Sequence, residues 1–246
     1  IRDRHSARSS PKLCNFAGEQ VHHKLQSVGA QALKKQNVYK NTFIIIMADN
    51  GRPFPHSKTR LNDQGVKTPF ILVYKNGNVT GKTESLVSSI DIAPTILDFA
   101  GIEIGQNYQG KSFKYLLEKP DEPFRNFVFA EHNWHDYESH QRMVRNKDFM
   151  YIENNRNQYA QRGPLDAINS DSYASLLKKL ESGDISEVQK EIFISPRPKE
   201  EFYELNEDLF QRTNLIDDEK YQKNINNNKK KKIKKIKVKK KKKFKL

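Results

Sequence analysis

The chain has 246 residues, begins Ile1-Arg2-Asp3-Arg4 and carries a formal net charge of +14. Its length allows one large domain, or one domain with a smaller one, and its hydrophobic content of 35% predicts that part of it stays unfolded. The charge is unevenly spread, because residues 229–246 hold 13 lysines and no acid, which leaves residues 1–228 at +14 − 13 = +1. This distribution argues against specific nucleic-acid binding by the folded part. No apolar run approaches the roughly 20 residues of a membrane helix, so no membrane partner is expected.

The first 20 residues show no hydrophobic periodicity and are predicted to be irregular. They contain the single cysteine, Cys14, so no intrachain disulfide can form. The neighbours of Cys14 supply no recognisable activating motif, which gives no support to a nucleophilic role. No signal peptide is present at the start, and the sequence leaves the location of the protein open.

Residues 21–122 show the alternation of strand and helix that is typical of an α/β sandwich. Apolar positions at a 3.6-residue period predict a helix over 21–36. Continuous apolar runs at 42–48 and 69–74 are typical of strands buried on both faces, as in a parallel sheet covered by helices. We expect strands 43–48 and 70–73 to share one sheet, with helix 91–100 packed on it.

The helix that ends near Ala100 has the clearest boundaries in the sequence. Ser89 or Asp91 can cap its start, Pro94 suits a first turn, and Gly101 follows its last apolar position.

Residues 123–223 are predicted to form a small antiparallel subdomain. A short strand at 127–129, a hairpin that turns at 146–148, a helix at 173–180 and a strand at 201–205 follow in order. Residues 224–246 consist mainly of Asn and Lys, which cannot build a core, and we expect a disordered lysine-rich tail.

The segment after the first apolar run is the most informative part of the sequence. Asp49-Asn50-Gly51 can be a hairpin turn, but Pro53 and Pro55 cannot donate to a partner strand. Alternatively the strand ends at Ala48, and a loop begins at the sheet edge where open α/β folds bind ligands. Asp49 and Asn50 would then offer hard oxygen ligands for Ca²⁺ or Mg²⁺. From spacing alone the two interpretations are equally good.

The set of motifs then resembles the second half of type I sulfatases, which share the alkaline-phosphatase-like α/β fold. The resemblance rests on Asp49-Asn50-Gly51 with Pro53-Phe54-Pro55, on Lys58, on segments 66–71 and 88–97, and on 201–205 with Asn214-Leu215. Within that family it points to the heparan N-sulfatase branch. It implies that Asp49 and Asn50 are two ligands of one Ca²⁺ and that Lys58 contacts the sulfate.

The family's nucleophile is a formylglycine made from the first residue of a Cys/Ser-x-Pro-x-Arg motif. Cys14-Asn15-Phe16-Ala17-Gly18 does not match it, and no such motif occurs in the 246 residues. The resemblance therefore implies that the nucleophile belongs to a missing amino-terminal half, and that this chain is inactive alone.

Residues 130–140 contain three histidines, acids and a tryptophan, and they form a second candidate site. Zinc binding, a plain surface loop, and a loop that reaches over the sulfate site are the three interpretations; the zinc spacing matches no known motif. Related sulfatases also have histidines near the substrate in this region. The resemblance thus suggests His135, His132 and Arg142 as contacts to a sulfated sugar.

We therefore expect an incomplete alkaline-phosphatase-like sandwich with a small antiparallel subdomain, from a sulfatase acting on sulfate esters or sulfamates of glycosaminoglycan sugars. A phosphate or phosphonate ester hydrolase is the nearest enzymatic alternative, and a basic nucleic-acid-binding protein is the non-enzymatic one. The intact family is typically lysosomal, secreted or periplasmic.

Overall fold

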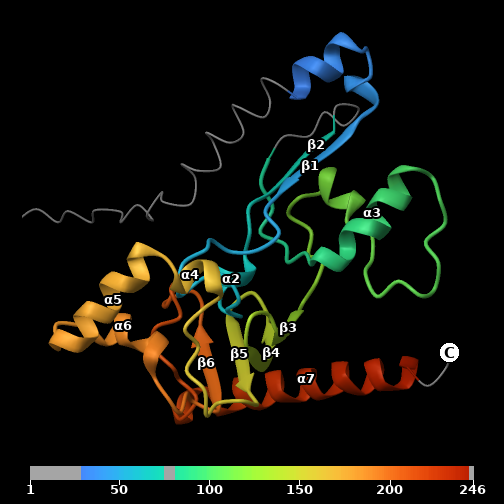
Figure 1. The fold of residues 1–246 in the computed structure, drawn as a ribbon. Helices are drawn as coiled ribbons and strands as arrows, with labels where there is room; N and C mark the ends of the chain where they lie inside the picture. Colours follow the sequence, from blue (N-terminus) through green and yellow to red (C-terminus); the bar gives the residue numbers. More distant parts are fainter. Residues whose placement is uncertain (1–28, 75–80, 244–246) are drawn as a thin grey trace, which may run out of the picture. The chain divides into compact units, whose positions relative to one another are not determined.

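The computed structural model describes residues 29–74 and 81–243, with side chains as far as Lys232. The chain separates into two compact units (Figure 1). The first comprises residues 1–47 and 69–78, and the second comprises residues 48–68 and 79–246. Residues 1–20, much of the helix expected at 21–36 and Cys14 lie outside the described residues. The helix is present over 29–35, the part that the structure describes.

The first unit contains a two-stranded antiparallel sheet. Strand β1 (Phe43–Met47) pairs with β2 (Phe70–Tyr74), with Phe43 opposite Tyr74 and Met47 opposite Phe70. A short 3-10 helix, η2 (Tyr39–Asn41), precedes β1. Both expected strands are therefore present in one sheet, but the expectation of parallel pairing is wrong for this pair. A parallel partner needs a crossover, usually through a helix, and the only α-helix between these strands has four residues.

The second unit holds the remaining elements. Its helices are α2 (Asp63–Val66), η3 (Ser89–Asp91), α3 (Ile92–Phe99), η4 (Lys114–Leu117), α4 (Leu165–Ile168), α5 (Asp171–Ser182), α6 (Glu187–Lys190), η5 (Glu191–Phe193), η6 (Glu219–Tyr221) and α7 (Gln222–Lys243). Its strands are β3 (Val128–Trp134), β4 (Glu138–Arg145), β5 (Phe149–Asn154) and β6 (Glu200–Glu204). No described helix is long and apolar enough to cross a membrane.

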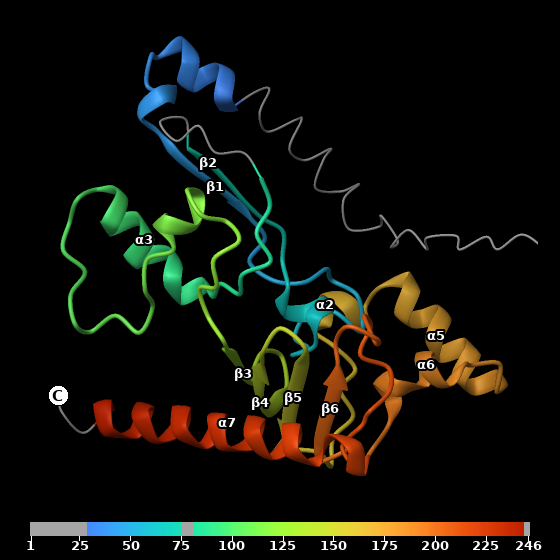
Figure 2. The same ribbon diagram turned by 180° about the vertical axis from the view of Figure 1, so that it is seen from behind.

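Strands β3 to β6 form one antiparallel sheet in the order β3-β4-β5-β6, visible from both sides in Figures 1 and 2. The hairpin expected at 146–148 is confirmed, and Asn146 closes it by accepting from the backbone N–H groups of Asp148 and Phe149. The predicted helix at 173–180 and strand at 201–205 are also confirmed as α5 and β6, with slightly different ends.

The two faces of this sheet bury different clusters, because side chains alternate along each strand. On one face, Met143, Ile152 and Tyr203 pack with Leu61 from the segment after β1. On the other face, Tyr151 and Phe202 pack with residues from η6 and α7. The segment 48–68 covers one face of the sheet, which we call the loop face. The terminal helix covers the opposite face, which we call the helix face.

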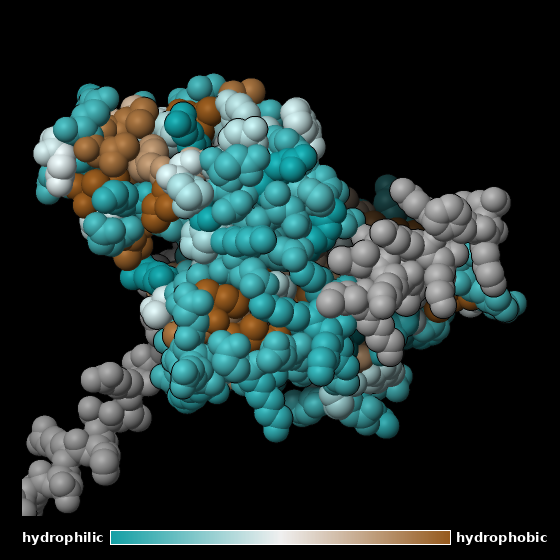
Figure 3. All heavy atoms as spheres, turned by 90° about the horizontal axis from the view of Figure 1, so that it is seen from below, coloured by the Kyte–Doolittle hydropathy of each residue, from teal (hydrophilic) through white to brown (hydrophobic). Residues whose placement is uncertain are grey.

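The prediction that residues 224–246 are disordered is wrong for residues 224–243, which lie in a helix. Helix α7 begins at Gln222 and runs along the helix face (Figures 1 and 2), with Ile225, Asn228 and Lys232 buried. Lys232 Nζ lies 2.5 Å from Glu153 Oε1, and Lys229 Nζ lies 2.8 Å from Glu200 Oε2. One isoleucine in a polar run can anchor a helix when the sheet beside it offers carboxylates, and composition alone does not reveal those partners. From below, the side on which α7 lies in Figure 1, the surface is mainly hydrophilic with separate hydrophobic patches (Figure 3).

Helix α3 ends close to where the sequence predicts, and Gly101 has φ of +70° just past the end. The cap differs from the expected Ser89 or Asp91, because Ser88 forms a capping box with Asp91 at the start of η3, which leads into α3. The carboxylate of Asp91 is fully buried and binds Arg125, so the residue that helps to cap this helix also joins it to the segment before β3. Within its unit α3 contacts η3 and η4. Its packing on β1 and β2, which belong to the other unit, stays a prediction.

Candidate functional site

The loop after β1 begins where the sequence predicted, and it is not a two-residue hairpin. Asp49 is exposed, and Asn50 donates from Nδ2 to the Gly51 carbonyl at 2.9 Å, which leaves its Oδ1 free to act as a ligand. Gly51 donates its N–H to the Gly65 carbonyl at 3.1 Å. A Cβ at residue 51 would lie 2.2 Å from the Gln64 carbonyl oxygen, so only glycine allows this close approach.

A histidine fixes the middle of the loop. Asn62 caps α2 by accepting from the Gly65 N–H through Oδ1, at 3.2 Å. Its Nδ2 therefore points to His56 Nε2, 2.9 Å away, and that nitrogen must accept. His56 Nδ1 then carries the proton and donates to Glu191 Oε2 at 3.0 Å. The arrangement selects the neutral Nδ1–H tautomer of His56.

Glu191 also receives a bidentate ion pair from Arg60. The two hydrogen bonds measure 3.1 Å and 2.8 Å, and Arg60 donates a third to Gln161 at 3.1 Å. Burial disfavours the charged form of Glu191, but Arg60 and His56 outweigh it and hold the pKa of that carboxyl at about 2. The base of the loop is thereby tied to a segment about 130 residues further along the chain.

Lys58, the predicted sulfate contact, projects from the same loop toward helix α4. Its Nζ lies 2.7 Å from Asp166 Oδ2, and its side chain is 21% exposed. The residue before Asp166, Leu165, donates its backbone N–H to Asp136 Oδ2 at 2.7 Å. That hydrogen bond, reinforced by His135, lowers the pKa of Asp136. The β3–β4 turn thus binds Leu165, and Lys58 binds the next residue of α4, Asp166.

His135, predicted to contact a sugar, lies in this turn and is exposed. Its Nδ1 is 3.0 Å from Asp136 Oδ2, and its backbone N–H donates to the Tyr137 carbonyl at 3.3 Å. The structure therefore brings His135 and Lys58 into one polar cluster, which we call the Lys58 cluster and define as Lys58, His135, Asp136 and Asp166.

His132 lies on the loop face, directly opposite Gln141 in the pairing of β3 with β4. Both of its ring nitrogens are buried, and neither has a hydrogen-bond partner within the described part of the chain. Burial lowers the pKa of His132, and the neighbouring Gln141 side chain opposes that shift. An uncharged imidazole with unused polar atoms is therefore directed into the interior of this face.

Arg142 is not brought to the Lys58 cluster. It lies on the helix face, where its Nε is 3.4 Å from Glu131 Oε2 on the neighbouring strand. The alternation of β4 explains the difference, since Gln141 and Arg145 face the loop and Arg142 faces the other way. Arg145 binds Asp63 of α2 at 2.8 Å and 3.0 Å, so it supports the loop.

No sequence motif identified the two acids that complete the cluster. Asp166 follows Lys58 by 108 residues, and no motif that we recognised surrounds it. Asp136 adjoins His135, but its bond to Leu165 depends on tertiary structure.

No group of three or more His, Cys, Asp or Glu side chains suited to a metal ion occurs among the described residues, which gives no support to zinc at His132, His135 and His140. Asp49 and Asn50 fit as two oxygen ligands of a Ca²⁺ shell of about six to eight. No described residue pairs with the Asp49 carboxylate, so it is available to a cation.

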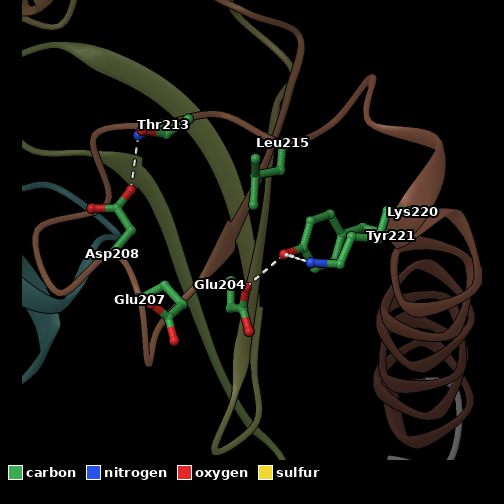
Figure 4. Close-up of a pocket in the computed structure, with 7 residues that line it drawn as sticks. All are labelled: Glu204, Glu207, Asp208, Thr213, Leu215, Lys220 and Tyr221. Atoms are coloured by element: carbon green, nitrogen blue, oxygen red, sulfur yellow. Dashed lines mark hydrogen bonds between the residues drawn. The ribbon is translucent and has the colours of Figure 1, made fainter.

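A surface pocket of about 520 Å³ lies away from these residues, between the end of β6 and η6 (Figure 4). Asp208 accepts from the backbone N–H groups of Arg212 and Thr213, and Tyr221 donates its hydroxyl hydrogen to Glu204. These hydrogen bonds stabilise the turn that leads to α7, so the polar side chains that line the pocket have a structural role.

Comparisons with known proteins find mainly sulfatases, with phosphonate monoester hydrolases also among the similar structures. A family model described as "N-sulphoglucosamine sulphohydrolase, C-terminal" matches residues 56–160. An ulvan-active sulfatase of Formosa agariphila is 30% identical over 220 residues, which are 87% of this chain and 36% of that protein. The human N-sulphoglucosamine sulphohydrolase is 26% identical over 215 residues, covering 80% of this chain and 42% of that protein.

A solved structure described as a protein in complex with its substrate, D-glucosamine-2-N,6-O-disulfate, shares the fold. Its TM-score is 0.63 at 20% identity, and the match covers 89% of this chain and 38% of that chain. The chain spans well under half the length of these relatives. The comparisons support a carboxy-terminal portion of a sulfatase, and the match to the solved structure shows the shared α/β fold.

Proposed function

We propose that this chain supplies the carboxy-terminal share of an active site that hydrolyses sulfate esters or sulfamates on glycosaminoglycan sugars. The observation that carries the proposal is the position of Lys58, nine residues after Asp49 on a loop whose base is fixed by Arg60 and Glu191. A positively charged side chain is suited to binding an anion with several oxygens, such as a sulfate.

Each residue has a defined role in this proposal. Asp49 and Asn50 contribute two oxygens to a Ca²⁺ ion, which would neutralise charge on the sulfate oxygens. Lys58 adds a second positive charge, and Asp166, 2.7 Å from its amine, competes with the sulfate for that amine. His135 hydrogen-bonds the sugar, and His132 lies deeper on the loop face with its ring nitrogens unpaired among the described residues.

The nucleophile is proposed to come from residues outside this chain, since the 246 residues hold no Cys/Ser-x-Pro-x-Arg motif. Lys58 can bind an anion but cannot provide the covalent step. The substrate class is supported by the N-sulphoglucosamine sulphohydrolase model over residues 56–160 and by the sulfated sugar named with the related structure.

A binding experiment on the chain itself tests the proposal. N-sulfoglucosamine should give a saturation-transfer NMR signal with the 246-residue chain in the presence of Ca²⁺, and Lys58→Ala should remove most of it. Lys179→Ala is the matched control, because Lys179 also forms an exposed ion pair with an aspartate, at 3.0 Å. Equal loss in both variants, or no loss in Lys58→Ala, would contradict the proposed site.

A further inference from the structure

We propose that Trp134 and Tyr137 form an aromatic surface that receives the pyranose ring of the sugar whose sulfate binds Lys58. This inference rests on the proposed function and deepens it, because it names the side chains that recognise the sugar ring rather than its sulfate. Trp134 is the last residue of β3, where it pairs with Glu138, and Tyr137 lies in the turn that follows.

Both rings are largely exposed to solvent. Trp134 is 69% exposed and Tyr137 is 53% exposed. Aromatic side chains of this size bury large areas in most proteins, and exposed apolar groups that gather at one place commonly mark binding surfaces. Leu165, which faces the same turn through its backbone N–H, is exposed as well.

The turn is held in place, so the rings are presented from a fixed support. The bond from the Leu165 N–H to Asp136 ties it to α4, and the bond from the His135 N–H to the Tyr137 carbonyl closes it. Lys58 binds the next residue of α4, Asp166. Consecutive Cα atoms are about 3.8 Å apart, so the turn and Lys58 share one short anchoring site.

The chemistry of a sulfated sugar matches this combination. A pyranose ring presents C–H groups on its faces and hydroxyl groups around its edge, so a flat aromatic ring can cover a face while polar groups bind the edge. Trp134 and Tyr137 provide the rings, His135 provides a hydrogen-bonding group beside them, and Lys58 provides the charge for the sulfate.

The single tryptophan of the chain makes this surface directly observable, because Trp134 is the sole source of indole fluorescence. The 246-residue chain with Ca²⁺ would be titrated with N-sulfoglucosamine, with glucosamine and with sodium sulfate at matched ionic strength. We expect a saturable emission change with N-sulfoglucosamine, a weaker one with glucosamine and none with sulfate alone.

Variants then measure the contribution of each ring to affinity, by ligand-observed NMR. Trp134→Ala should weaken N-sulfoglucosamine binding by about fivefold or more, since stacking of a ring on an aromatic side chain is worth on the order of 1 kcal/mol. Tyr137→Ala should weaken it less, and Tyr137→Phe should leave it unchanged. Tyr108→Ala is the matched control, because Tyr108 is another exposed tyrosine for which no contact to the Lys58 cluster is seen.

The outcomes separate this inference from the proposed function. Loss of binding in Lys58→Ala with no change in Trp134→Ala would overturn the aromatic surface and leave the sulfate site standing. Loss in Trp134→Ala with full binding in Lys58→Ala would overturn the placement of the sulfate and keep the aromatic surface. No saturable emission change with any sugar would overturn the inference and assign Trp134 to packing against another part of the protein.

Discussion

Removing the side chain that anchors α7 should destabilise the second unit. Ile225 is 1% exposed and packs with Tyr151, Phe202 and Tyr221 on the helix face. Replacing a buried isoleucine by alanine costs about 2–5 kcal/mol, because transfer energy is lost and a cavity remains. At about 2–4 °C per kcal/mol for a unit of this size, Ile225→Ala should lower Tm by about 4–20 °C.

Urea unfolding followed by circular dichroism would give the same quantity as a free energy of unfolding. Lys230→Ala is the matched control on the same helix, because Lys230 is exposed, and it should change the stability by less than about 0.5 kcal/mol. Truncation after Tyr221 should cost at least as much as Ile225→Ala. If Ile225→Ala and Lys230→Ala unfold at the same urea concentration, α7 does not pack as described, and the tail is dispensable for the fold.

Three further changes follow from the loop and its partners. Glu191→Gln should lower the free energy of unfolding by about 1–2 kcal/mol at neutral pH, after allowance for solvent screening. The pKa of Glu191 in the folded chain, about 2, lies below the usual 4.5, so this loss should shrink as the pH falls from 4.5 toward 2 in urea titrations. A loss of the same size at pH 2 would contradict the ion pair. Asp166→Asn should release Lys58 and strengthen sulfate binding by about twofold to fivefold, as exposed ion pairs are worth about 0.2–1 kcal/mol, and weaker binding by NMR would show that Asp166 is needed to place the amine. The chain should hydrolyse no chromogenic sulfate and, in calorimetry, bind Ca²⁺ with a Kd of about a millimolar or weaker, since Asp49 brings only one negative charge; a micromolar site would mean that other ligands complete the shell.

Local signals in the sequence were sufficient for most elements of the fold. The turn at Asn146 and the strand expected at 43–48 each depend on neighbours close in the chain, and the structure has both, with the strand ending at Met47. The cap was predicted one residue away from Ser88, which the structure uses. Local sequence signals did not predict that β2 runs antiparallel to β1. An apolar run predicts a strand, but it carries no information about whether the neighbouring strand is parallel or antiparallel.

In the candidate site too, local motifs could be identified from the sequence and tertiary contacts could not. Lys58 and Asp49 are close in sequence and could be identified from a motif, whereas Asp166 and Glu191 reach the loop only through tertiary contacts. Arg142 lies on the other face of the sheet from the Lys58 cluster, because a shift of one position along a strand moves a side chain to the opposite face. The anchoring of α7 was missed because a lysine-rich segment acquires partners only from the sheet on which it lies.

The hydrogen bonds that fix the loop have a consequence for the order in which the chain folds. His56 and Arg60 bind Glu191, 135 and 131 residues downstream, and Lys58 binds a residue 108 positions downstream. Contacts of such high sequence separation form late, since a long stretch of chain must be closed before they contribute. During synthesis the loop therefore emerges well before its partners, and it takes its final shape only when the nascent chain has passed residue 191.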